Sequence, residues 1–145
     1  MPGTRHRMRR ALLQSVYAWL MESDAPEEVL DEALSFHEVE SENRDYAHRL
    51  FQGIVANRAA ADQILAKLLE HWSLDRMGQV ELAVCYLALH ELQADPGVPV
   101  EVIIDEAVRL GKEYAGPESG HFVNGLLDAA VAIVRPESLG DKAPV

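Results

Sequence analysis

The strongest constraint on this sequence is the spacing of its apolar residues, which recur every three or four positions along nearly the whole chain. Such spacing puts apolar side chains on one face of an α-helix, and no convincing stretch shows the period-two alternation of a half-buried strand. Pro and Gly interrupt the pattern at short polar junctions, where one helix ends and the next begins. The sequence therefore predicts helices over residues 4–22, 26–35, 43–57, 59–70, 74–93, 99–115 and 118–134.

Short connections between these helices predict mostly antiparallel neighbours, and hence an all-α bundle. A chain of 145 residues suits one compact domain, or two small helical halves that share a core. The helix expected over 74–93 is apolar around much of its circumference, which predicts a central position. Its cysteine, Cys85, has apolar neighbours, so we expect a small buried side chain without a reactive role.

Charge is distributed unevenly along the chain. Residues 1–21 carry four arginines and no acidic residue, whereas the other nine Lys and Arg face all 24 Asp and Glu in residues 22–145. A basic N-terminus on an acidic body suggests an arm that binds phosphates or an acidic partner. Each guanidinium can form a forked pair of hydrogen bonds with phosphate. The alternative is a solvated, partly frayed helix start, where cations oppose the helix dipole. These arginines are Arg5, Arg7, Arg9 and Arg10.

A basic start followed by apolar residues also imitates a secretory signal peptide. Gln14 and Ser15 break the apolar run, however, and acidic residues follow without a small-residue cleavage pattern. Elsewhere no run reaches the roughly 18 apolar residues that a membrane span requires. The sequence therefore predicts a mature cytoplasmic protein that does not span a membrane.

Residues with catalytic potential are scattered. The six histidines show no HExxH spacing, and there is no Gly-rich phosphate loop. Four carboxylates could pair as general acid and base, but solvated charge is the simpler interpretation. We therefore expect neither enzymatic activity nor a cofactor or metal. The four carboxylates are Glu81, Asp105, Glu106 and Asp128.

Aromatic residues near a basic site can stack on nucleic-acid bases. Phe122 and Tyr17 are candidates for this role, with core packing as the default for each. Trp19 and Trp72 are expected in the core or at a junction between halves.

The dipeptide Asn124-Gly125 is a strong signal for a two-residue hairpin turn, yet apolar residues on both sides have helical spacing. The spacing places the dipeptide inside the helix expected over 118–134. Because Gly125 lacks a Cβ, we expect a neighbouring helix to approach closely there, offsetting the helix penalty of roughly 1 kcal/mol. Asn124 is expected to bond the backbone of a nearby helix end or loop, with RNA contact as the alternative.

Several stretches together resemble the NusB family of bacterial transcription antitermination factors. They occur in family order and cover roughly residues 7–136: RRALLQSVYAWL, FQGIVANRAAADQIL, GQVELAVCYLALHEL, VPVEVIIDEAVRLGKEY and FVNGLLDAAVAIVRP. The resemblance implies a single NusB-like domain over 1–136 with about seven helices in two small antiparallel sub-bundles. Within it, residues 1 to about 10 would form an arginine-rich arm, and 137–145 would form a flexible tail.

The resemblance also implies a non-enzymatic function. NusB-like proteins pair with the small-subunit ribosomal protein that acts as NusE, and the pair binds single-stranded boxA RNA of nascent ribosomal RNA leaders. The complex helps RNA polymerase resist termination. An acidic surface that meets a basic ribosomal protein would give the acidic body a use. Self-association into a homodimer is a further arrangement that the family allows.

Site residues follow position by position from the resemblance. RNA contacts would come from Arg5, Arg7, Arg9 and Arg10, joined by His121 and Phe122 near the start of the last helix. The ribosomal-protein partner would meet Tyr17, Asp75, Arg76 and Glu81.

Three positions depart from the family pattern. Asp105 stands where the family usually has Asn, Gly111 should loosen its helix by up to about 1 kcal/mol relative to Ala, and His121 replaces a residue that is often basic. Two other functions compete with RNA binding: a stand-alone NusB-like adaptor without RNA specificity, and a helical metal hydrolase.

Overall fold

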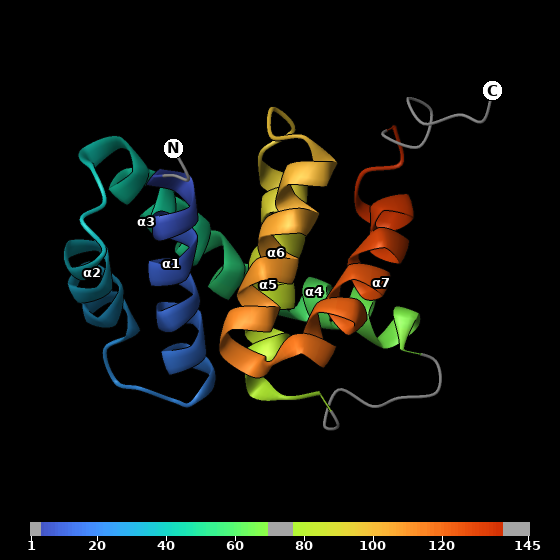
Figure 1. Cartoon of the computed structure of the whole chain (residues 1–145), viewed down its shortest axis with the longest axis horizontal. Coiled ribbons are helices and arrows are strands. Elements are labelled where there is room, and N and C mark those ends of the chain that lie inside the picture. The colour runs from blue at the N-terminus through green and yellow to red at the C-terminus, as the bar shows by residue number, and fades with distance from the viewer. Residues whose placement is uncertain (1–3, 70–76, 138–145) are drawn as a thin grey trace. The chain divides into compact units, whose positions relative to one another are not determined.

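The computed structural model describes residues 4–69 and 77–137 of the chain. These residues form seven helices and no strand, so the all-α prediction is confirmed. The chain divides into two units, residues 1–56 and residues 57–145. The first holds α1 (Thr4–Leu20), α2 (Pro26–Phe36) and α3 (Ser41–Ala56); the second holds α4 (Arg58–Leu68), α5 (Gln79–Ala94), α6 (Val100–Ala115) and α7 (Pro117–Val134) (Figure 1).

Helix boundaries agree with the predicted ones to within two residues, except at the start of α5. The sequence predicts that helix from residue 74, but Gly78 has an extended backbone (φ −64°, ψ 148°), so α5 begins only at Gln79. The Gly78 N–H donates a hydrogen bond to Glu81 Oε1 (3.3 Å), which satisfies one donor at the helix start. Trp72 and the tail from residue 138 onward lie outside the described residues.

In the first unit, α1 packs against α2 and α3. The packed side chains recur at helical spacing and are at most 4% exposed, and each contributes roughly 1.5–3 kcal/mol by its burial. They include Leu12 and Val16 of α1, Leu30 and Leu34 of α2, and Leu50 and Ile54 of α3.

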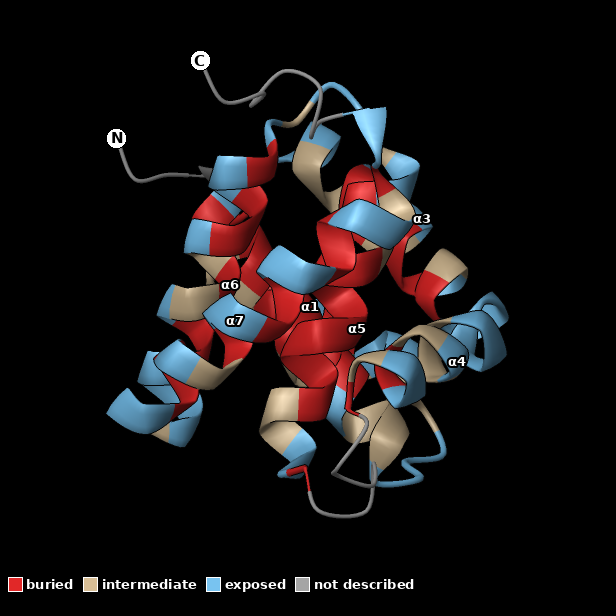
Figure 2. Cartoon of the chain, turned by 90° about the vertical axis from the view of Figure 1, so that its right-hand side faces the viewer, coloured by how far each residue is buried: buried red, intermediate tan, exposed pale blue. Residues whose placement is uncertain are grey.

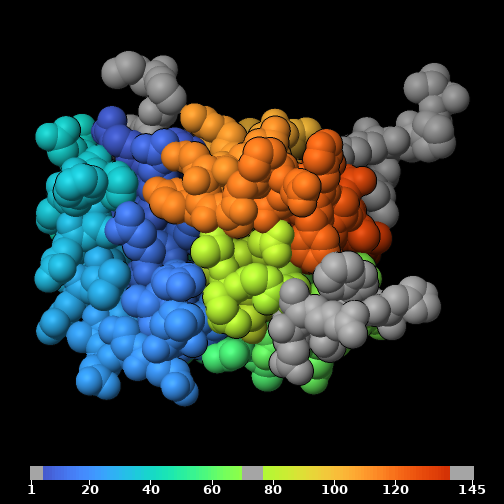
Figure 3. All heavy atoms as spheres, turned by 60° about the horizontal axis from the view of Figure 1, so that its bottom comes forward, coloured from blue at the N-terminus to red at the C-terminus, as the bar shows by residue number. Residues whose placement is uncertain are grey.

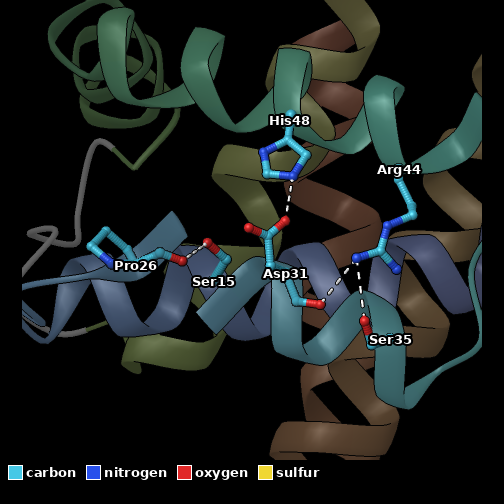
Figure 4. A network of polar contacts seen from close by, with 6 residues as sticks. All are labelled: Ser15, Pro26, Asp31, Ser35, Arg44 and His48. Carbon is cyan, nitrogen blue, oxygen red and sulfur yellow. Dashed lines mark hydrogen bonds and ion pairs between the residues drawn. The ribbon is translucent and has the colours of Figure 1, made fainter. Parts of the chain in front are cut away.

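Polar contacts link the helices of this unit (Figure 4). The Ser15 hydroxyl donates to the Pro26 carbonyl (2.7 Å) and so joins α1 to the start of α2. The Asp31 carboxylate lies 2.7 Å from His48 Nε2, and Arg44 donates to the Asp31 carbonyl (3.3 Å). Because Asp31, Arg44 and His48 are partly solvated, we expect their contacts to contribute modestly to stability while fixing how α2 lies on α3.

The turns after α1 and α2 both place a non-glycine residue in the left-handed region. Glu38 has φ 55°, its N–H donates to the Ser35 carbonyl (3.1 Å), and the next N–H, of Val39, donates to the Leu34 carbonyl (2.9 Å). Glu22, with φ 62°, occupies the equivalent position after α1. This is the hydrogen-bond pattern of a Schellman turn, in which glycine is preferred because a Cβ is strained there.

We expect Glu38→Gly to raise the free energy of unfolding by about 0.5–1 kcal/mol, because the strain of the left-handed turn exceeds the added entropy of the unfolded chain. Urea denaturation would measure the change. Glu32→Gly, at an exposed position inside α2, is the matched control and should lower stability by about 1 kcal/mol. Equal losses in the two variants would show that Glu38 is not strained.

In the second unit, α5 is the central helix, as predicted. All of residues 82–89 are buried, and Figure 2 shows α5 in red along most of its length. Within it Cys85 is fully buried, and this burial, aided by the charge of Glu81, raises the pKa of the thiol to about 12. The thiol therefore stays protonated and unreactive, as expected for a small buried side chain.

Helices α6 and α7 pack on α5 and on each other. The buried stripe of α6 runs through Val100, Ile103 and Ile104, whereas Val102 is 42% exposed. Continuing at three- and four-residue steps, that stripe also includes Ala107, Leu110 and Gly111.

Arg135, the residue after α7, is 4% exposed and is surrounded by backbone carbonyls. Its Nε and Nη2 donate to the Leu92 carbonyl (3.0 and 2.7 Å), Nη2 also to the Asp95 carbonyl (3.0 Å), and Nη1 to the Val98 carbonyl (2.7 Å). These acceptors lie at the end of α5 and in the connection to α6. The guanidinium therefore satisfies carbonyls that have no partner within a helix and offsets the negative end of the α5 dipole.

Candidate nucleic-acid interface

The predicted arginine run forms the first two turns of α1, where the four side chains differ in exposure. Arg5 is exposed, Arg7 and Arg10 are half-buried, and Arg9 is only 2% exposed. The first turn of α1 contains no acidic residue to offset the helix dipole. An anionic ligand at this end would balance both the positive charge of the arginines and the positive end of the helix dipole.

Arg5 is held against α3 rather than frayed. Its Nε donates a hydrogen bond to Asn43 Oδ1 (3.0 Å), and its Cζ lies 3.9 Å from the ring centroid of Tyr46. Arg49 of α3 also approaches that ring, at 5.8 Å. The cation–π contact fixes the guanidinium while leaving the residue exposed. Sequence reasoning missed Asn43 and Tyr46, because nothing in the spacing of α3 identifies what its side chains contact.

Arg7 has an unsatisfied polar group. Its Nε is buried and has no hydrogen-bond partner among the residues that the structure describes. A buried donor without an acceptor costs roughly 1–3 kcal/mol. An acceptor oxygen from outside the chain, such as a phosphate oxygen, would remove that cost.

A second group of predicted residues lies at the start of α7. His121 is exposed and Phe122 is half-buried. Phe122 lines a hollow of about 510 Å³ together with Ser119 of α7, residues at and just before the start of α5, including Met77 and Glu81, and the end of α6. Figure 3 shows the yellow-green start of α5 bordered by orange residues of α6 and α7. The structure thus brings together one expected RNA residue, Phe122, and one expected partner residue, Glu81.

Glu81 is not the solvated carboxylate that the sequence suggested. It is half-buried, accepts the hydrogen bond from the Gly78 N–H, and also accepts a hydrogen bond from the Ser119 hydroxyl. The carboxylate therefore links the start of α5 to the first turn of α7. Ser119 was missed because a serine in a helical first turn is usually interpreted as a local cap.

Other predicted residues have mixed outcomes. Tyr17 is 39% exposed, so core packing, the default expectation for it, is wrong. Trp19 is half-buried. Asp75 and Arg76 lie outside the described residues, and their expected contact with a protein partner stays a prediction.

Asn124 and Gly125 lie inside α7, as the helical spacing predicts, but their expected structural roles are wrong. Both are exposed, and a Cβ built on Gly125 would meet no atom within 4 Å, so no helix approaches there. Asn124 makes no side-chain hydrogen bond within the described part of the chain. The close approach lies one turn earlier, at Gly120, where a Cβ would come within 2.6 Å of Lys112 Cε.

We expect Gly125→Ala to raise the free energy of unfolding by about 1 kcal/mol, because alanine favours the helix and its methyl group has open space. Gly116→Ala is the contrasting variant, since Gly116 joins α6 to α7 with φ 113° and ψ 166°, a conformation almost restricted to glycine. It should lose about 1–3 kcal/mol. Urea denaturation of both variants would measure these changes. A lower free energy of unfolding for Gly125→Ala would indicate that a neighbouring helix does pack closely at Gly125.

Among residues 4–69 and 77–137, no three His, Cys, Asp or Glu side chains are placed to hold a metal ion together. None of the helices in these ranges has the length and apolarity to cross a bilayer.

The chain is similar to known proteins over nearly its whole length. A model of the NusB family matches residues 6–132. The chain is 38% identical over 147 residues to the transcription antitermination protein NusB of Anaeromyxobacter dehalogenans (strain 2CP-1 / ATCC BAA-258), with 98% of this chain and all of that protein covered. It is 39% identical over 140 residues to the protein of the same name from Myxococcus xanthus (strain DK1622), with 92% and 99% covered.

Two solved structures have similar folds. The structure of T. maritima NusB matches with a TM-score of 0.85 and 33% sequence identity, covering 95% of this chain and 97% of that chain. A chain in the crystal structure of antitermination factors NusB and NusE in complex with dsRNA matches with a TM-score of 0.74 and 29% identity, covering 90% and 97%.

Proposed function

The chain belongs to the NusB family, and from this premise we propose that it is a non-enzymatic RNA-binding factor that acts in transcription antitermination. In this proposal it pairs with the ribosomal protein NusE and binds single-stranded boxA-type RNA of nascent ribosomal RNA leaders. The pair would join an RNA polymerase antitermination complex in the cytoplasm and support ribosomal RNA transcription. A related structure that holds NusB, NusE and dsRNA together supports both kinds of partner.

The observation that carries the RNA role is the arginine end of α1. Arg5 is exposed and held by Asn43 and Tyr46, while Arg7 has a buried Nε without an acceptor among the described residues. Phosphate contacts supply most of the affinity for RNA, and guanidinium groups suit them well. We therefore assign Arg5, Arg7 and Arg10 to the RNA backbone, and Phe122 with His121 to a base at the start of α7.

The protein partner is supported by charge and by the hollow at Glu81. Residues 22–145 are strongly acidic, which would attract a basic ribosomal protein and steer its approach. Glu81 lines a hollow that a partner side chain can enter. We place Tyr17, Asp75, Arg76 and Glu81 in this contact.

The proposal is tested by titrating a boxA-like single-stranded RNA with and without the purified ribosomal protein. We expect wild type to bind more tightly when the partner is present, and the variant with Arg7→Glu and Arg10→Glu to lose at least tenfold in affinity. Arg109→Glu, at an exposed site on α6, is the control for a charge reversal outside the arginine run. Equal RNA binding by all three proteins, with no partner effect, would overturn the proposal.

The adaptor function is the alternative, and the burial of Arg9 favours it, because that side chain is 2% exposed and adds nothing to an RNA surface. A complex with the ribosomal protein that neither binds RNA nor changes RNA affinity would establish the adaptor. Sedimentation velocity of the protein alone would settle whether it forms a homodimer.

A further inference from the structure

A second hollow, of about 520 Å³, lies entirely within the first unit at the C-terminal end of α1. Its inner side is apolar and aromatic, with half-buried Trp19, buried Phe51 and Val55, which is 39% exposed. Three exposed carboxylate residues line the hollow where the chain turns into α2: Asp24, Glu27 and Glu28. The lining contains no Lys, Arg or His. None of these residues is assigned to RNA or to the ribosomal protein above.

The rim of this hollow is fixed by the backbone. The Schellman turn at Glu22 reverses the chain after α1, with the Ser23 N–H donating to the Ala18 carbonyl (2.9 Å). The Ser23 hydroxyl then accepts a hydrogen bond from the Ala25 N–H (3.3 Å), and the Ser15 hydroxyl holds the Pro26 carbonyl (2.7 Å; Figure 4). A ligand would therefore meet a largely formed site and would not have to order a loop.

The lining selects for one kind of ligand. Three carboxylates repel phosphate, so RNA does not fit here. Glu27 and Glu28 lie in the first turn of α2, where negative charge complements the helix dipole. An aliphatic side chain would use the aromatic floor but leave the carboxylates unpaired. A guanidinium suits both, because its planar face stacks on indole and its edge donates forked hydrogen bonds to carboxylates.

We propose that this hollow docks an arginine side chain from a cationic protein segment. The proposal does not depend on the RNA role, and it gives the two ends of α1 opposite ligands. The arginines lie in its first two turns and the hollow lies at its last, and a helix of 17 residues is roughly 25 Å long. An RNA backbone at one end therefore leaves the other end open to a basic protein.

The test uses a decapeptide of alternating arginine and glycine, with citrulline in place of arginine in the matched peptide, which has nearly the same shape without the charge. Trp72→Phe leaves Trp19 as the one tryptophan of the chain, which has two. We expect a saturable change in Trp19 fluorescence with the arginine peptide and at least tenfold weaker binding of the citrulline peptide. If Trp72→Phe does not fold, 5-fluorotryptophan NMR of the native sequence reports on Trp19 separately.

Charge-neutral variants locate the binding. The double variant Glu27→Gln, Glu28→Gln should weaken binding of the arginine peptide at least tenfold. The double variant Glu32→Gln, Glu40→Gln removes the same charge at exposed residues outside the hollow and should weaken binding less than twofold. Equal effects of the two variants would assign the binding to overall charge and overturn the proposal. Equal affinity for both peptides would overturn it in favour of an apolar ligand. Trp19 changes that follow protein concentration without peptide would overturn it in favour of a second copy of the chain. RNA binding by the same variants is titrated separately, and its result neither supports nor contradicts arginine binding in the hollow.

Discussion

Replacing Arg135 by methionine should lower the free energy of unfolding by about 3–5 kcal/mol, the largest loss that we expect from a single substitution. The guanidinium is 4% exposed and donates to the carbonyls of Leu92, Asp95 and Val98. Hydrogen bonds from a charged donor contribute roughly 1.5–3 kcal/mol each, and carbonyls left buried without a donor add a desolvation cost. Methionine fills a similar volume, so the loss would report the polar contacts rather than a cavity.

The sign of this effect is informative because burying a charge is itself costly. No carboxylate pairs with Arg135 in the described part of the chain, so its desolvation is offset only by backbone carbonyls and by the dipole of α5. If desolvation exceeded those contacts, Arg135→Met would stabilise the protein. Arg135→Lys separates charge from geometry, because an ammonium group keeps the charge but cannot span three carbonyls. We expect it to lose about 2 kcal/mol.

Urea and thermal unfolding would measure these changes, and a loss of 3–5 kcal/mol should lower Tm by about 10–20 °C in a domain of this size. Arg109→Met is the matched control, because Arg109 is exposed on α6 and should shift stability by less than about 0.5 kcal/mol. A loss within 1 kcal/mol for Arg135→Met would show that the carbonyl contacts contribute little.

The helices could be predicted from the sequence because apolar spacing is a local property. All seven are present, and the central position of α5 is visible in its continuous apolar run. What failed depends on neighbours distant in the chain. Gly125 was expected at a close contact, but the contact occurs at Gly120, since which glycine meets Lys112 depends on how α7 lies on α6. Arg135 contacts carbonyls about 40 residues away in sequence, and no local sequence pattern predicts these contacts.

The candidate site shows the same division. The arginine run is obvious in the sequence, yet Arg5 and Arg9, which are four residues apart on one helical face, are exposed and buried respectively. Helical spacing predicts the same role for both arginines, but tertiary packing buries one and leaves the other exposed. Similarly, Glu81 looked like a solvated charge, but Ser119, from a helix later in the chain, donates to it. The family resemblance assigned Glu81 to a partner without indicating this internal contact.

The second large effect concerns the salt dependence of RNA binding under the proposed function. Each phosphate neutralised on single-stranded RNA adds about −0.7 to the slope of log K against log salt concentration. Four arginines would give a slope near −3, but Arg9 is 2% exposed. We therefore expect a slope of about −2, from Arg5, Arg7 and Arg10. Fluorescence anisotropy of a labelled boxA-like RNA between about 50 and 200 mM salt would measure it.

Substitutions of single arginines by glutamine show whether three or four arginines contact the RNA, because each phosphate contact that is lost reduces the magnitude of the slope by about 0.7. Arg7→Gln should show that reduction together with weaker binding, and the variant with Arg5, Arg7 and Arg10 all changed to glutamine should bind at least 100-fold less tightly at low salt. Arg9→Gln should leave the slope unchanged and instead lower the free energy of unfolding, because its guanidinium is buried. A wild-type slope near −3 that falls equally with Arg9→Gln would place Arg9 at the RNA and require α1 to move when RNA binds.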